Sequence, residues 1–169
     1  MTKENLEHIP DYYYTYLDLV TEKDYFKALE NTTVEFEEFV ESFPISKENY
    51  RYGEEKWSSK QVLLHIIDTE RIFQYRVLCF IRDERRGLPG YDQNHYAQNS
   101  VPETRTMGSI LEEFKVVRAS TKVLFKNIDK ELLLVKKMAN GFSVQPLLYG
   151  YLLSGHLRHH INILKDKYF

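Results

Sequence analysis

Apolar residues recur at three- and four-residue spacing along four stretches of this chain, and the few glycines cluster between those stretches. This spacing places the apolar side chains on one face of an α-helix, so it predicts amphipathic helices. No stretch combines sustained apolar–polar alternation with turn pairs, so strands are not needed to explain the sequence. Four such helices bury their apolar faces against one another, and we predict an all-α four-helix bundle.

Signals at the helix ends set approximate bounds. The predicted helices cover residues from about 21 to 43, 58 to 85, 107 to 128 and 146 to 169. Asp24 stands three residues after Thr21 in a capping-box arrangement, and Pro146 suits a first helical turn. A tyrosine-rich lead-in, residues 12–20, is expected to form a short helix of its own.

The connection between the second and third helices, Gly87 to Glu103, is long for a compact domain. Connections of this length often form lids or pocket walls. Its chemically informative residues are Tyr91, Asp92, His95 and Tyr96. Two interpretations stay open: a functional pocket wall, or an exposed loop with a turn of helix from Asp92 to Gln98.

Composition narrows the function classes. The length suits one domain, and we expect residues 1–169 to form a single bundle domain. The content of 43% hydrophobic and 28% charged residues is that of an ordinary globular protein. A net charge of −2 gives no basic surface for nucleic acid or anionic lipid, and no apolar run approaches the roughly 20 residues of a membrane span. The N-terminus lacks the apolar core of a signal peptide, and the single cysteine, Cys79, suits a reducing compartment. We therefore expect a cytoplasmic protein.

Three of the six histidines fall together in the middle of the fourth predicted helix. His156 and His160 are four residues apart, so both imidazoles project from one helix face and can reach one metal at about 2.0–2.1 Å. On a helical wheel both lie near the middle of the apolar arc, whereas His159 falls at its edge. Buried imidazoles need partners for their nitrogens. A metal is one such partner, and hydrogen bonds to other core side chains are the alternative.

A catalytic metal site typically has three protein ligands and one open position, so another helix must supply a third ligand. His65 is the best candidate because it lies on the inward face of the second helix, which must then adjoin the fourth. His95 is the rival, and His8 is the least favoured. Cys79 is a poor candidate, because fourteen helical residues beyond His65 correspond to about 21 Å.

One turn after His65 stands Asp68, for which two roles are open. Its carboxylate could orient an imidazole from outside the ligand set. Alternatively it pairs at the surface with Arg71 or Lys60. The motifs of zinc proteases, of phosphate-binding glycine loops, of serine hydrolases and of di-iron bundles are all absent from the sequence.

Two stretches carry a family resemblance: KWSSKQVLLHIID, residues 56–68, and GHLRHH, residues 155–160. Supporting stretches are LPGYD at 88–92 and GFSV at 141–144. On these residues the chain resembles, over nearly its whole length, the DinB/YfiT-like family, whose members are regarded as metalloenzymes. The resemblance implies a four-helix bundle of non-standard up-and-down order, with one divalent metal held by three histidines. Those positions map here onto His65, His156 and His160.

The resemblance also suggests an activity, because characterised relatives include S-transferases that use bacillithiol, mycothiol or glutathione, and a mycothiol-dependent maleylpyruvate isomerase. Three neutral histidines leave a zinc, nickel, iron or manganese ion its full charge and an open position for water or a thiol. We rank transfer of a low-molecular-weight thiol to an electrophilic small molecule first and a metal-dependent hydrolase second. A metal-stabilised binding or stress-response module without turnover is third. A pocket open from the metal to solvent, with Tyr91 and Tyr96 as walls, would favour an enzyme. The oligomeric state stays open, with a homodimer among the options.

Overall fold

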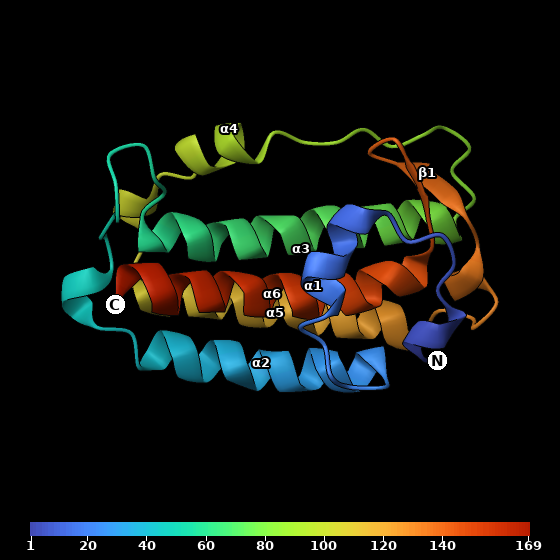
Figure 1. The fold of residues 1–169 in the computed structure, drawn as a ribbon, viewed down its shortest axis with the longest axis horizontal. Coiled ribbons are helices and arrows are strands. Elements are labelled where there is room, and N and C mark those ends of the chain that lie inside the picture. The colour runs from blue at the N-terminus through green and yellow to red at the C-terminus, as the bar shows by residue number, and fades with distance from the viewer.

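The computed structural model describes residues 1–169 and confirms the predicted bundle (Figure 1). The four long helices are α2 (Tyr25–Glu41), α3 (Ser59–Ile81), α5 (Met107–Lys126) and α6 (Pro146–Tyr168). Two short helices accompany them, α1 (Tyr14–Leu17) in the tyrosine-rich lead-in and α4 (Gln93–Gln98) in the long connection. None of the helices combines the length and apolarity that crossing a membrane requires.

The order of the helices around the bundle differs from their order in the chain. Helix α6 packs against α2 and α3, and α5 packs against the same two helices from the other side. The consecutive helices α2 and α3 therefore stand diagonally opposite each other. Figure 1 shows α3 and α5 running in the same direction, so the connection between them, residues 82–106, returns along the length of the bundle. The predicted adjacency of the two histidine-bearing helices, α3 and α6, is confirmed.

Capping side chains decide where the helices begin. The carboxylate of Asp24 accepts hydrogen bonds from the backbone N–H groups of Phe26 and Lys27, at 3.0 and 3.1 Å. Asp24 is therefore the residue that caps α2, and the prediction of a start near Thr21 was wrong by four residues. Ser58 caps α3 in a capping box with Gln61, as the serine signal predicted.

The end predicted for the second helix was too late. Helix α3 stops at Ile81 rather than near Arg85, and Asp83 lies in the left-handed region at φ 59°. A chain that enters this conformation cannot continue a right-handed helix, so it turns here into the long connection.

The interpretation that strands are not needed was wrong, because a small antiparallel hairpin precedes α6. Strands β1 (Lys137–Ala139) and β2 (Phe142–Val144) pair through a two-residue turn, Asn140-Gly141. Both turn residues have positive φ, 52° and 79°, which is the tight hairpin turn that Asn-Gly favours. Strands of three residues are too short to show alternation, so the Asn-Gly pair was the only local signal. Ala139 also bridges to Leu88, which fastens the long connection to the hairpin.

A buried polar layer crosses the bundle and receives one side chain or more from every long helix. Arg118 of α5 forms a buried ion pair with Glu70 of α3 at 2.8 Å, and it donates to Thr32 of α2 at 2.9 Å. Thr32 in turn lies 3.2 Å from the hydroxyl of Ser154 in α6. Apolar clusters fill the bundle on both sides of this layer. His156 follows Ser154 by two residues and His65 precedes Glu70 by five, so the layer lies next to the candidate site along the bundle.

Candidate metal centre

Three histidine side chains converge between α3 and α6. The Nε2 atom of His156 lies 3.1 Å from Nε2 of His65 and 3.1 Å from Nε2 of His160. Helix α3 supplies the first of these residues, and one face of α6 supplies the pair at four-residue spacing. All three potential ligand atoms lie within 4.8 Å of one another. The structure thus brings together the three histidines singled out in the sequence.

Mutual hydrogen bonding does not account for this convergence. A ring nitrogen carries either one proton or one lone pair, so Nε2 of His156 can complete a hydrogen bond with only one of its two neighbours. Two nitrogens bound to one ion at about 2.0–2.1 Å, at angles between octahedral and tetrahedral, lie roughly 2.8–3.4 Å apart. The observed separations of 3.1 Å fall in this range. The residues present therefore fit a divalent metal ion.

The protonation state also suits a metal. His65 and His156 are 3% and 7% exposed. Burial lowers the pKa of His65 to about 4, helped by the nearby charge of His159. Burial likewise holds the pKa values of His156 and His160 well below the ordinary range, and neighbouring imidazoles add to both shifts. All three rings are thus neutral at physiological pH, which is the form that binds a metal.

The surroundings of the His65 ring are apolar rather than acidic. The Trp57 ring packs against it with centroids 4.9 Å apart, and its Nδ1 atom is buried without a hydrogen-bond partner. Asp68 makes no hydrogen bond to an imidazole, so its proposed orienting role was wrong. It lines a separate surface pocket that includes His95, and burial raises its pKa.

The alternative surface pairing of Asp68 was wrong as well. Arg71 pairs instead with Glu113, and Lys60 pairs with Glu48 at 3.4 Å. Asp68 is a neighbour of His65 on the helix surface by spacing, but its side chain lines the pocket beside His95 instead of contacting the ring.

The remaining candidates lie outside the cluster. His95 is exposed on α4, away from the other rings. His159 is half-buried, and its ring contacts Tyr16 edge-on with centroids 5.2 Å apart. Cys79 is a free thiol, and its side chain packs beside the apolar core. The helical wheel thus separated the two adjacent histidines correctly, with only His160 facing the other Nε2 atoms.

A pocket of about 290 Å³ connects the histidine cluster with solvent and reaches it at His156. Its walls include Tyr13 and Tyr16 from the lead-in and Tyr91 from the long connection. The expectation for Tyr91 is confirmed, and its hydroxyl is held by Thr69 at 2.6 Å. Tyr96 touches the Tyr91 ring but lines the separate pocket beside His95, so its expected place as a wall was wrong.

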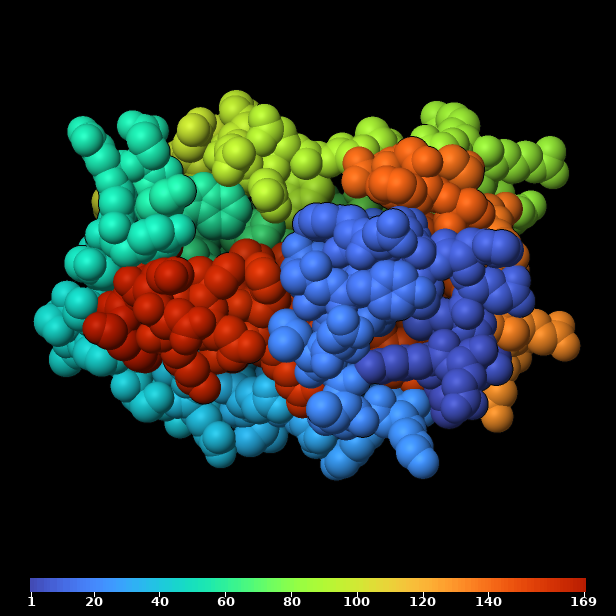
Figure 2. All heavy atoms as spheres, in the orientation of Figure 1, coloured from blue at the N-terminus to red at the C-terminus, as the bar shows by residue number.

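The lead-in is the wall that sequence reasoning missed. Figure 2 shows the N-terminal residues, in blue, lying across the middle of α6, in red. The Tyr16 ring packs edge-on against His156 with centroids 5.4 Å apart. A Cβ on Gly155 would lie 2.6 Å from the carbonyl carbon of Tyr16 and closer still to its oxygen. Only glycine permits this approach, so the glycine just before His156 was the available signal.

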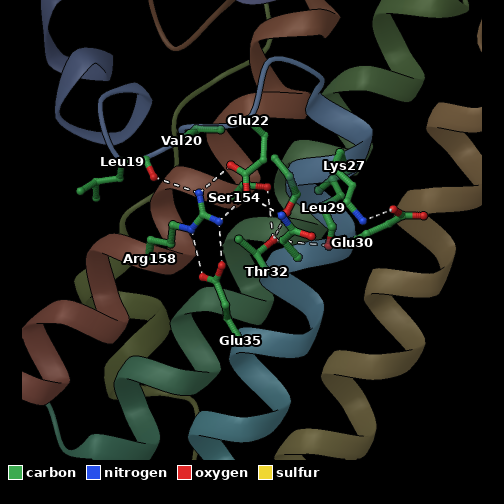
Figure 3. A network of polar contacts seen from close by, with 12 residues as sticks. Leu19, Val20, Glu22, Lys27, Leu29, Glu30, Thr32, Glu35, Ser154 and Arg158 are labelled. Atoms are coloured by element: carbon green, nitrogen blue, oxygen red, sulfur yellow. Dashed lines mark hydrogen bonds and ion pairs between the residues drawn. The ribbon is translucent and has the colours of Figure 1, made fainter.

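An ion-pair network around Arg158 stabilises the contact between α6 and the lead-in (Figure 3). The Arg158 side chain is only 16% exposed and pairs with Glu22 and Glu35 at 2.7 Å each. It also donates to the carbonyl oxygen of Leu19 at 3.0 Å. These contacts join α6 to α2 and to the end of the lead-in, and hydrogen bonding to Arg158 lowers the pKa of Glu22 to about 2.

The comparisons with known proteins agree with this fold. The structure of YfiT from Bacillus subtilis superposes with a TM-score of 0.75 at 16% sequence identity, covering 95% of this chain and 91% of that one. That protein is described as a probable metal-dependent hydrolase with an unusual four-helix bundle topology. Among curated proteins, none matches this sequence significantly. The family model of the DinB superfamily matches residues 28–164, most of the chain. The chain therefore belongs to the DinB superfamily.

Proposed function

We propose that this protein is a metal-dependent enzyme for a small-molecule substrate, with His65, His156 and His160 as the ligands of one divalent ion. The observation that carries the proposal is the convergence of three neutral imidazoles, two of them buried, with Nε2 of His156 at 3.1 Å from Nε2 of both His65 and His160. A pocket that opens from His156 to solvent supports an enzyme over a purely structural site, since a substrate can reach the cluster.

A divalent ion bound by three neutral imidazoles supplies a Lewis acid that can activate water or a thiol near pH 7. The chain's own residues determine what reaches it. Tyr13, Tyr16, Tyr91 and Phe73 line the pocket with aromatic rings, and its volume of about 290 Å³ suits a small molecule. No carboxylate contacts the cluster, so the protein supplies no general base of its own there.

Hydrolysis is the reaction that this geometry supports best. A pocket of about 290 Å³ holds one small molecule beside His156, and hydrolysis needs one organic substrate and a water. The description of YfiT as a probable metal-dependent hydrolase supports the same choice.

Transfer of a low-molecular-weight thiol to an electrophile is the second candidate. It is favoured by the neutral ligand set, which leaves the ion the charge needed to hold a thiolate. This reaction needs two organic molecules, and the thiol would then have to extend out of the pocket.

The first experiment measures metal content and thermal stability. Protein purified from metal-supplemented medium is expected to contain about one first-row divalent ion per chain, and chelation is expected to lower its melting temperature. His160→Gln should abolish the shift, whereas His95→Gln should preserve it. A metal content near zero, with no shift on adding zinc or nickel, would contradict the proposal.

The second experiment separates the reactions. Metal-loaded protein is incubated with small esters and amides, and separately with an electrophile and bacillithiol, mycothiol or glutathione. Metal-dependent product without thiol identifies a hydrolase, and product only with thiol identifies a transferase. Either activity should survive Cys79→Ser, because Cys79 lies outside the cluster. Full metal occupancy without any turnover would instead support a metal-stabilised module.

A further inference from the structure

One buried charge in the pocket has no partner of opposite sign. Arg76 is only 4% exposed, and it lines the pocket that reaches His156. One guanidinium nitrogen donates to the carbonyl oxygen of Pro89 at 3.0 Å. The Tyr149 hydroxyl also lies beside the guanidinium, but no carboxylate forms an ion pair with it, so its charge is uncompensated and several of its five N–H donors are left free.

Two other arginines with little exposure have carboxylate partners within the chain. Arg118 pairs with Glu70, and Arg158 pairs with both Glu22 and Glu35. A buried cation is costly unless an anion compensates it. Asp92, also on the pocket wall, does not serve Arg76, because it is exposed and its carboxylate caps α4 through Asn94 and His95. The compensating anion is therefore expected to come from outside the chain.

Arg76 and His156 line the same pocket. The Phe73 ring lies close to both, with its centroid 6.5 Å from that of His156 and 5.9 Å from Cζ of Arg76. A single small molecule can therefore contact the guanidinium at one end and approach the cluster with the other. Both groups hold their positions from long helices, α3 and α6, rather than from loops.

We propose that Arg76 binds the carboxylate of the substrate, which makes the substrate a small monocarboxylic acid that carries its reactive group several bonds away. This rests on the proposed function for the identity of the reacting end, but the binding of the acid end does not require a metal. A guanidinium matches a carboxylate with two parallel hydrogen bonds and one compensating charge. A phosphate dianion would leave one charge uncompensated in a pocket that already includes Asp92.

The binding test uses phenylacetate and its neutral counterpart phenylacetamide, since tyrosines line the pocket. Wild-type protein is expected to bind the acid more tightly than the amide by about 10- to 100-fold, measured by calorimetric or NMR titration. Arg76→Gln should remove this preference, and Arg76→Lys should retain part of it. Arg85→Gln removes the same charge from an exposed position and should leave the preference intact.

Two further comparisons make the result decisive. The acid preference should persist in chelated protein and in His160→Gln, where the metal is lost or weakened. A preference that disappears on chelation but survives Arg76→Gln would place the carboxylate on the metal and overturn the assignment. Equal binding of acid and amide by the wild type would overturn it without any variant. Tighter binding of phenyl phosphate than of phenylacetate would assign the site to phosphate esters instead.

Discussion

Burial rather than an acidic neighbour sets the chemistry of the three histidines. Their rings lie among aromatic and aliphatic side chains, where a charged imidazolium is disfavoured. The fold therefore keeps His65, His156 and His160 neutral and ready for a metal, at the cost of leaving Nδ1 of His65 without a hydrogen bond.

The adjacent histidines of α6 provide a matched test at this scale. His160→Gln is expected to lower metal affinity by orders of magnitude, because it removes one of three converging nitrogens and keeps the bulk of the side chain. His159→Gln should leave the stoichiometry near one, since its ring packs on Tyr16. Competition with a metal-binding dye measures both. The reverse pattern would mean that α6 is rotated about its axis.

The depressed histidine pKa values also predict the pH dependence of the metal-free protein. Below about pH 6.5 these histidines bind protons in the unfolded chain but remain neutral in the folded chain. This difference persists until the pH approaches the folded pKa of His65, near 4. The free energy of unfolding should therefore fall as the pH drops through this window, by about 1.4 kcal/mol per pH unit for each such histidine.

Urea titrations between pH 7 and 4.5 check this slope. His160→Gln should make the slope shallower, because it removes one of the imidazoles whose pKa burial lowers. Stability that stays constant between pH 7 and 5 would show that the histidines protonate freely in the folded protein.

At the scale of elements, the contact between the lead-in and α6 shapes the mouth of the pocket. A methyl group on Gly155 would overlap the backbone of Tyr16, which cannot move as a flexible side chain can. Gly155→Ala is therefore expected to displace the lead-in and to destabilise the protein by about 1–3 kcal/mol. Thermal unfolding measures the loss.

Helix α5 offers the matched control. A Cβ on Gly108 would meet nothing closer than 3.9 Å, and alanine is the better helix former. Gly108→Ala should leave the melting temperature unchanged or raise it. Equal effects of the two substitutions would mean that the lead-in is not packed as tightly on α6 as the structure has it.

At the scale of the whole molecule, the polar layer fixes how the four helices sit against one another. Arg118 contacts residues of α2 and α3 from its place on α5, so one side chain connects three helices. Arg118→Met would leave the carboxylate of Glu70 buried without its cation. The expected cost is about 3–5 kcal/mol of unfolding free energy.

The exposed pair Lys27–Glu30, at 3.3 Å, gives the control. Lys27→Met removes a cation from the surface and should change stability by no more than about 0.5 kcal/mol. Chemical denaturation of both variants tests the difference. A small effect of Arg118→Met would indicate that water enters the layer and solvates Glu70.

Helix content and the orientation of α6 could be predicted because both depend on short-range periodicity. The face that carries His156 and His160 follows from 3.6 residues per turn, and the Ser58 and Asp24 signals mark helix starts within a few residues. His65 could be placed inward in the same way. The hairpin could not be predicted from periodicity, because its three-residue strands are too short to show a pattern and are defined by their pairing with each other.

Four amphipathic helices and their inward-facing histidines follow from local sequence, since those properties arise within one helix. The packing of Tyr16 over His156, the need for a small residue at position 155 and the lack of a carboxylate partner for Arg76 emerge only in the folded chain. These facts depend on contacts between residues far apart in the chain. Periodicity says which side of a helix is buried, but it carries no information on what is packed against that side.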